Sequence, residues 1–260
     1  MADIKIKTSQ EINLMAEGGK ILSAILAKTL TKAAPGISTR ELDKYAQDLI
    51  LAAGGKPSFK MEKGYYFTTC MCVNDIVVHG IPTDYRLKNG DILGVDAGVF
   101  YKGFHTDASW TKAVNTAKSK ASSRVEKFLA TGEAALDRAI GQCMPGNHVG
   151  DISKTIQETV EGAGYSVVRQ LVGHGVGRDL HENPEIPGFV RGRTENTPKI
   201  LPGMVFAVEV IYNYGGPQVV YGGDDGWTIV TRDGSPSGLF EHTVAITDRG
   251  PEILTPKRAF

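Results

Sequence analysis

Apolar side chains recur with helical spacing along the first 54 residues, and two polar signals mark where helices begin. Thr-Ser-Gln-Glu at residues 8–11 and Ser-Thr-Arg-Glu at 38–41 both have the sequence of a capping box. In this motif the side chain of the first residue accepts a hydrogen bond from the backbone N–H of the fourth, and the side chain of the fourth accepts one from the backbone N–H of the first. The first helix is predicted to stop at Pro-Gly, residues 35–36, because proline cannot continue a helix. The second is predicted to end at Gly-Gly, residues 54–55.

The pattern then changes to short β-branched and aromatic runs. Between Tyr65 and Phe104 these runs are interrupted by Asn-Asp, Pro and Asn-Gly, which predicts a series of strands. Helical periodicity returns from about Ser119 to Met144 and from about 151 to 163, and strands follow to the C-terminus. Blocks of helices alternating with blocks of strands are typical of an α+β fold.

An internal repeat relates the two blocks. With a shift of 110 residues, the segment 35–54 matches the segment 145–164 at six identical and four similar positions out of twenty. We therefore predict one domain over residues 1–260, with internal halves of about 1–110 and 111–260. Each half is a helix-helix-strand unit, and the duplicated units are expected to close around one shared sheet with its cleft where they meet.

Composition and charge narrow the class of protein. The 260 residues include 29 basic and 29 acidic side chains, and this balance argues against nucleic acid or an anionic membrane as the partner, since both attract a basic surface. The N-terminal residues have no apolar signal-peptide core, and no 18 apolar residues run together. Three cysteines without a Cys-x-x-Cys motif predict reduced thiols and a cytoplasmic protein: Cys70, Cys72 and Cys143.

Two aspartates flank a predicted hairpin. If its tip is Tyr101-Lys102, Asp96 and Asp107 lie directly opposite each other with Cβ atoms about 4.5–5.5 Å apart. Carboxylates this close repel each other, so such a pair shares a proton or a cation. The alternative is a pair of solvated aspartates beside a surface turn.

Three more residues could join this pair. His174 lies in a glycine-rich segment that leaves its ring accessible, although a hydrogen-bonded histidine in a turn would look the same. Glu209 and Glu241 are embedded in apolar, strand-like runs, where a carboxylate needs a cation or a buried salt bridge. Four carboxylates with one imidazole suit a pair of divalent transition ions better than a structural zinc site.

Several motifs make the chain similar to a known family over nearly its whole length. They are NDIVVHGIP at 74–82, GHGVGRDLHENPEIP at 173–187, PGMVFAVE at 202–209, DGWT at 225–228 and FEHTV at 240–244. With the aspartate hairpin, these motifs resemble those of the type I methionine aminopeptidases. The resemblance implies the pita-bread fold, a pseudo-two-fold arrangement around a curved antiparallel sheet. It also implies metal-dependent removal of the initiator methionine from proteins with a small second residue.

The same resemblance implies roles for individual residues. Two divalent ions, cobalt, manganese, iron or zinc, would be held by Asp96, Asp107, His174, Glu209 and Glu241. His79 and His181 would contact the substrate backbone, and Glu209 would also act as a general base. The methionine side chain would lie among Phe59, Tyr65, Cys70, Leu180 and Trp227. A structural Na⁺ or K⁺ would lie near Asn74, Ile76 and Ser237.

Residues 59–69 and Val210 depart from the family's usual pattern, which leaves the preferred substrate open. Two other functions also remain open. One is a proline-directed aminopeptidase or dipeptidase of the same fold, and the other is a peptide-binding module without catalysis, which would typically have lost ligands. The preferred interpretation is a cytoplasmic monomer that acts on the N-termini of nascent polypeptides, with transient ribosome contact and no nucleic acid or membrane partner.

Overall fold

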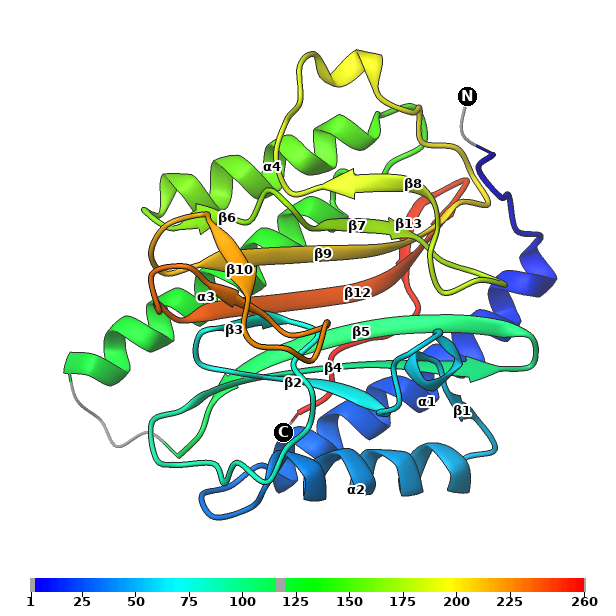
Figure 1. Cartoon of the computed structure of the whole chain (residues 1–260). Coiled ribbons are helices and arrows are strands. Elements are labelled where there is room, and N and C mark those ends of the chain that lie inside the picture. Colours follow the sequence, from blue (N-terminus) through cyan, green and yellow to red (C-terminus); the bar gives the residue numbers. More distant parts are fainter. Residues whose placement is uncertain (1–2, 116–119, 260) are drawn as a thin grey trace.

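The computed structural model describes residues 3–115 and 120–259, and its first half consists of two helices followed by strands (Figure 1). Both predicted capping boxes are present: the N–H groups of Thr8 and Ser38 donate to the Glu11 and Glu41 carboxylates at 2.8 Å. The elements of this half are α1 (Ser9–Lys32), α2 (Thr39–Ala52), β1 (Lys56–Pro57), the 3₁₀ turn η1 (Phe59–Met61), β2 (Thr69–Val73), β3 (Ile76–Val78), β4 (Ile92–Tyr101) and β5 (Phe104–Ala113).

The second half repeats this order. Helix α4 is offset from α2 by 110 residues at both ends, as the internal repeat predicts, and the Asp151 carboxylate accepts a hydrogen bond from the His148 N–H at 2.8 Å at its start. The predicted start of the preceding helix, Ser119, lies outside the described residues. The elements are α3 (Lys120–Ile140), α4 (Val149–Gly162), β6 (Ser166–Val167), β7 (Val172–Gly175), β8 (Glu182–Pro187), η2 (Thr194–Asn196), β9 (Val205–Asn213), β10 (Val219–Tyr221), β11 (Ile229–Thr231), β12 (Ser237–Thr247) and β13 (Gly250–Ile253).

One large sheet joins the two halves. Its strands run in the order β1-β4-β5-β12-β9-β7-β8, with β13 paired to β12, β2 to β4 and β6 to β9, and every pair is antiparallel. Strand β5 of the first half pairs with β12 of the second, so the junction between the halves lies in the middle of the sheet. A smaller sheet, β10-β11-β3, lies beside it, with β3 in contact with β2, β9 and β12.

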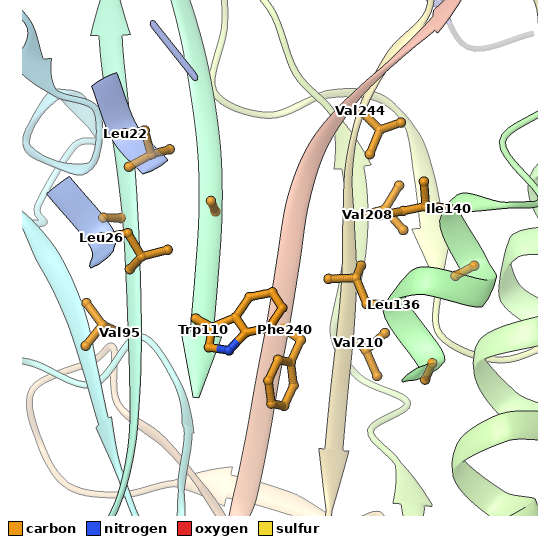
Figure 2. Close-up of a cluster of buried hydrophobic side chains, with 14 of the residues drawn as sticks. Leu22, Leu26, Val95, Trp110, Leu136, Ile140, Val208, Val210, Phe240 and Val244 are labelled. Carbon is orange, nitrogen blue, oxygen red and sulfur yellow. The ribbon is translucent and has the colours of Figure 1, made fainter. Parts of the chain in front are cut away.

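Successive side chains along each strand point to opposite faces of the large sheet. One face packs against α1 and α3, and Figure 2 shows Trp110 and Phe240 between Leu22 and Leu26 of α1 on one side and Leu136 and Ile140 of α3 on the other. Trp110 and Phe240 meet edge to face with ring centroids 5.0 Å apart. Neighbouring residues point to the opposite face, which is the face that carries the candidate chemistry.

The predicted register of the β4–β5 hairpin was wrong by one residue on each strand. The turn residues are Lys102 and Gly103, with φ of 48° and 92°, and not Tyr101 and Lys102. A two-residue turn in which both φ values are positive favours glycine at its second position. The presence of glycine at position 103 therefore indicated a turn at residues 102–103, and the prediction missed this signal. Asp96 therefore pairs with Ser109, and Asp107 lies diagonally across from it on the same face.

Two further expectations concern the whole chain. All three cysteines are buried and unpaired, which confirms the prediction of free thiols. Within residues 3–115 and 120–259, no helix combines the length and apolar character needed to cross a membrane.

The contact between α3 and the sheet predicts opposite outcomes for two glycine substitutions. A Cβ at Gly132 would lie within 2.6 Å of ring atoms of Phe240 and Tyr212, whereas a Cβ at Gly162, at the end of α4, meets nothing within 4 Å. We expect Gly132→Ala to lower the free energy of unfolding by about 1–3 kcal/mol through overpacking. The matched variant Gly162→Ala should raise it by about 0.5 kcal/mol. Urea denaturation measures both, and equal effects would contradict this packing.

Candidate metal centre

A single row of paired residues crosses the middle of the sheet and carries three carboxylates. Asp96 on β4 pairs with Ser109 on β5, Ser109 with Glu241 on β12, and Glu241 with Glu209 on β9. Directly paired residues point to the same face of a sheet. The row therefore brings Asp96, Glu241 and Glu209 to one face, although they are far apart in the sequence.

Asp107 and His174 complete the set. Asp107 lies two residues before Ser109, and His174 pairs with Ala207, two residues before Glu209, so both side chains share the face of the row. Ligand atoms of Asp107, His174 and Glu241 lie within 4.8 Å of one another. Asp96 and Glu209 line the same cavity as these three, so the structure brings together all five residues that the resemblance implied as ligands.

Burial makes this cluster unfavourable without a cation. It raises the pKa of Asp96 to about 7 and raises the pKa values of Asp107, Glu209 and Glu241, with mutual repulsion adding to the effect. Burial also lowers the pKa of His174 to about 4, which leaves a neutral imidazole with the lone pair that a metal needs.

Two carboxylate oxygens of the cluster lack a hydrogen-bond partner, which bears on whether a cation fits there. Oδ1 of Asp96 and Oδ1 of Asp107 are buried without a hydrogen-bond partner. Across residues 3–115 and 120–259, no lysine or arginine forms an ion pair with any of the four carboxylates. Buried carboxylates need a partner of opposite charge, and oxygen donors with one imidazole suit a divalent ion. The residues present therefore fit a metal.

Two further histidines line the cavity. His79 has a positive φ of 56°, a strained backbone conformation of the kind that accumulates at functional sites. Burial lowers its pKa to about 4, with the nearby His181 adding to the shift. The His181 ring lies 4.5 Å from that of His174, between centroids, and burial lowers the pKa of His181 as well. Both imidazoles are thus neutral and available for hydrogen bonding.

A buried ion pair holds the loop that carries His181. Lys7 Nζ lies 2.5 Å from Glu182 Oε2, and both side chains are only 5% exposed. Glu182 Oε1 also accepts the N–H of Arg178 at 2.8 Å, which ties the loop back on itself. Arg178 in turn pairs with Glu11 of α1 at 2.9 Å. Contacts from the N-terminal segment and from α1 together hold the backbone of the loop that contains His181.

One end of the cavity is apolar. The whole cavity has a volume of about 240 Å³, and the five residues expected to surround a methionine side chain all line it. The Tyr65 and Trp227 rings meet edge to face at 5.1 Å, and the Tyr65 hydroxyl donates to the Thr69 carbonyl at 2.9 Å. This end can hold an unbranched apolar side chain. Its lining residues are Phe59, Tyr65, Cys70, Leu180 and Trp227.

Sequence reasoning missed several residues of the site. Ser109 lies in the row between Asp96 and Glu241, and its buried Oγ has no hydrogen-bond partner. Ser109 lies two residues from Asp107 and so on the same face of the strand, and this spacing could have identified it. Glu62 and Gln170 also line the cavity, from loops that no periodic pattern marks.

The residues expected near a monovalent ion lie outside this cavity. Asn74, which has a φ of 56°, accepts the N–H of Ser237 at its carbonyl at 2.8 Å. Ile76 begins β3, two residues beyond Asn74. The three residues thus lie where β3 approaches the start of β12.

The raised carboxyl pKa values predict how the metal-free protein responds to pH. The folded state keeps a proton on Asp96 up to about pH 7 and holds protons on Asp107, Glu209 and Glu241 above their ordinary range, whereas the unfolded chain releases them near pH 4. Raising the pH from 5 to 8 should therefore destabilise metal-stripped protein, by about 1–4 kcal/mol. Bound manganese should remove most of this loss.

Urea denaturation of stripped and manganese-loaded protein at both pH values measures the effect. The variant Asp96→Asn, stripped of metal, provides the control, because it lacks one of the titrating groups and should show a smaller loss. Parallel pH dependences for stripped and loaded protein would contradict the account.

The chain matches known proteins along most of its length. The model of metallopeptidase family M24 matches residues 13–248. The methionine aminopeptidase of Clostridium perfringens is 45% identical, with 97% of this chain and 98% of that protein covered. Methionine aminopeptidase 1 of Bacillus subtilis is 41% identical, over 96% of this chain and 98% of that protein.

Solved structures agree with the sequence matches. The crystal structure of methionine aminopeptidase from Thermotoga maritima superposes with a TM-score of 0.91 at 38% identity, and 98% of this chain and all of that one are covered. Prolidase from Pyrococcus furiosus superposes with a TM-score of 0.77 at 22% identity, and the match covers 97% of this chain and 66% of that one. At this identity the similarity shows a shared fold and nothing more. The chain has the pita-bread fold, and it belongs to metallopeptidase family M24 and, within it, to the methionine aminopeptidases.

Proposed function

We propose that the chain removes the N-terminal methionine from newly made polypeptides whose second residue is small. The observation that carries this proposal is the composition of one cavity. It combines five metal-ligating side chains and two neutral imidazoles with an apolar end lined by aromatic rings and a thiol. Such an end suits the flexible, polarisable thioether of methionine.

Asp96, Asp107, His174, Glu209 and Glu241 are the proposed ligands of two divalent ions, drawn from manganese, iron, cobalt and zinc. When bound, the ions would supply Lewis acidity for amide hydrolysis. Their positive charge would also compensate the four buried or half-buried carboxylates, whose burial is otherwise costly.

The chain's own residues would then orient the substrate and move protons. Glu209, placed beside Glu241 in the row, is the proposed general base that carries a proton to the leaving amine. His181, next to the ligand His174, would donate a hydrogen bond to the carbonyl oxygen of the scissile bond as negative charge develops on it. His79, whose ring lies 6.1 Å from that of Trp227, would hold the peptide backbone between the apolar end and the ligands.

We infer that residues 1–260 act as one catalytic domain, because side chains of α1 and of α3 belong to the same buried cluster. We also infer that the protein works in the cytoplasm as a monomer, with transient contact to the ribosome from which its substrates emerge. A Na⁺ or K⁺ held near Asn74, Ile76 and Ser237 would steady the junction of β3 and β12.

Peptide hydrolysis tests the proposed reaction. Metal-stripped protein is reloaded with manganese, iron(II), cobalt or zinc and given Met-Ala-Ser, Met-Leu-Ser, Leu-Ala-Ser and Ala-Pro-Ser. We expect release of methionine from Met-Ala-Ser alone, and only after reloading, because the apolar end selects methionine and the second residue must be small. Cleavage of Ala-Pro-Ser would instead indicate a proline-directed enzyme. Binding of peptides without cleavage by the loaded protein would indicate a binding module.

The role of His79 makes a separate prediction. His79→Ala should lower kcat about 100-fold, which is typical of losing one positioned hydrogen-bond donor, while metal content stays that of the parent protein. His148→Ala is the matched control, because His148 lies at the start of α4 and does not line the cavity. Metal analysis and steady-state kinetics measure both variants, and near-normal turnover of His79→Ala would reject the role.

A further inference from the structure

Glu62 lies at the opening of the cavity, on the turn between two residues of the apolar end. It lines the cavity while remaining partly exposed. Its N–H donates to the Phe59 carbonyl at 3.1 Å, and its own carbonyl accepts the N–H of Tyr65 at 3.3 Å. The next turn is held by Trp227 Nε1, which donates to the Gly64 carbonyl at 3.2 Å. The backbone of Glu62 is therefore fixed at the edge of the site.

The Glu62 carboxylate belongs to no ion pair among the described residues. Over residues 3–115 and 120–259, no lysine or arginine forms an ion pair with it, and the described lining of the cavity contains neither residue type. The neighbouring Lys60 is directed elsewhere and donates to the Gln47 side chain. Among the carboxylates that line the cavity, Glu62 alone is outside the proposed ligand set.

The charge of Glu62 acts on the part of the cavity that carries His181. Burial lowers the pKa of His181, and the Glu62 carboxylate opposes this shift, so the two side chains lie within electrostatic range. Two divalent ions would balance the four ligand carboxylates and leave the charge of Glu62 uncompensated. A cleft lined by low-dielectric walls concentrates the field of such a charge.

Only some parts of a substrate can respond to this charge. The methionine side chain is apolar, every substrate has the same α-amine, and the second residue is small. The third residue is the first whose side chain can be both long and charged. We propose that Glu62 selects substrates by charge, favouring lysine or arginine at the third position and disfavouring aspartate or glutamate there; the proposal rests on the function proposed above.

Three C-terminally amidated peptides test the inference on the manganese-loaded enzyme: Met-Ala-Lys-Ser, Met-Ala-Ser-Ser and Met-Ala-Glu-Ser. We expect kcat/KM to fall in that order, by about three- to fivefold at each step, which is the size of a partly exposed ion pair. The change should appear in KM, because the charged side chain is bound equally before and during reaction. The preference among the three peptides should weaken as salt is raised above about 0.15 M.

Three variants assign the effect to Glu62. Glu62→Gln should give the three peptides nearly equal kcat/KM values, and Glu62→Lys should reverse the order. Glu126→Gln is the matched control, because it removes the same charge from an exposed position on α3 outside the cavity and should leave the parent order unchanged.

The outcomes separate this inference from the function on which it rests. Equal cleavage of all three peptides by the parent enzyme would overturn the inference and leave the function intact. A charge preference that survives in Glu62→Gln would also overturn it. Failure to cleave any of the three would overturn both.

Discussion

Four carboxylates on one face of a single sheet, three of them buried and Glu209 half-buried, are the constraint on which the rest of the structure depends. An ionised carboxylate taken out of water costs several kcal/mol unless a charge or hydrogen bonds compensate it. Asp96, Glu241 and Glu209 stand in one row of paired residues, so the backbone pairing itself prevents them from moving apart. No lysine or arginine in the described part of the chain forms an ion pair with them. A divalent metal centre explains why this arrangement can exist.

The opposite face of the same strands supplies the rigidity that the cluster requires. Trp110 and Phe240 are one residue away from Ser109 and Glu241, and they pack beneath α1 and α3 (Figure 2). Because successive residues of a strand alternate between faces, hydrophobic packing on one side fixes the positions of the carboxylates on the other. His79 and His181 come instead from loops, and the loop of His181 is held by the buried ion pair of Lys7 and Glu182.

Local signals predicted the helices well, because a capping box or a proline acts within a few residues. The equivalent ends of α2 and α4 could also be predicted, since the internal repeat preserved the residues at which they begin and end. Hairpin register could not be derived from the aspartates alone, because it depends on which two residues form the turn, and Gly103 decided that. Glu209 and Glu241 stood out as carboxylates in apolar strands, and Asp96 and Asp107 as a close pair on one hairpin, whereas the choice of all five as ligands came from the family resemblance. Glu62 was not identifiable in this way, because its importance lies in His181, a neighbour that is distant in sequence.

Anomalous diffraction from crystals grown with manganese tests the central claim most directly, because it locates the ions without relying on activity. The account predicts two manganese peaks in the cavity, each within coordination distance of carboxylate oxygens from the set Asp96, Asp107, Glu209 and Glu241, with His174 bound to one of them. Absence of manganese from this cluster, with the carboxyl groups hydrogen-bonded to one another in its place, would contradict the account.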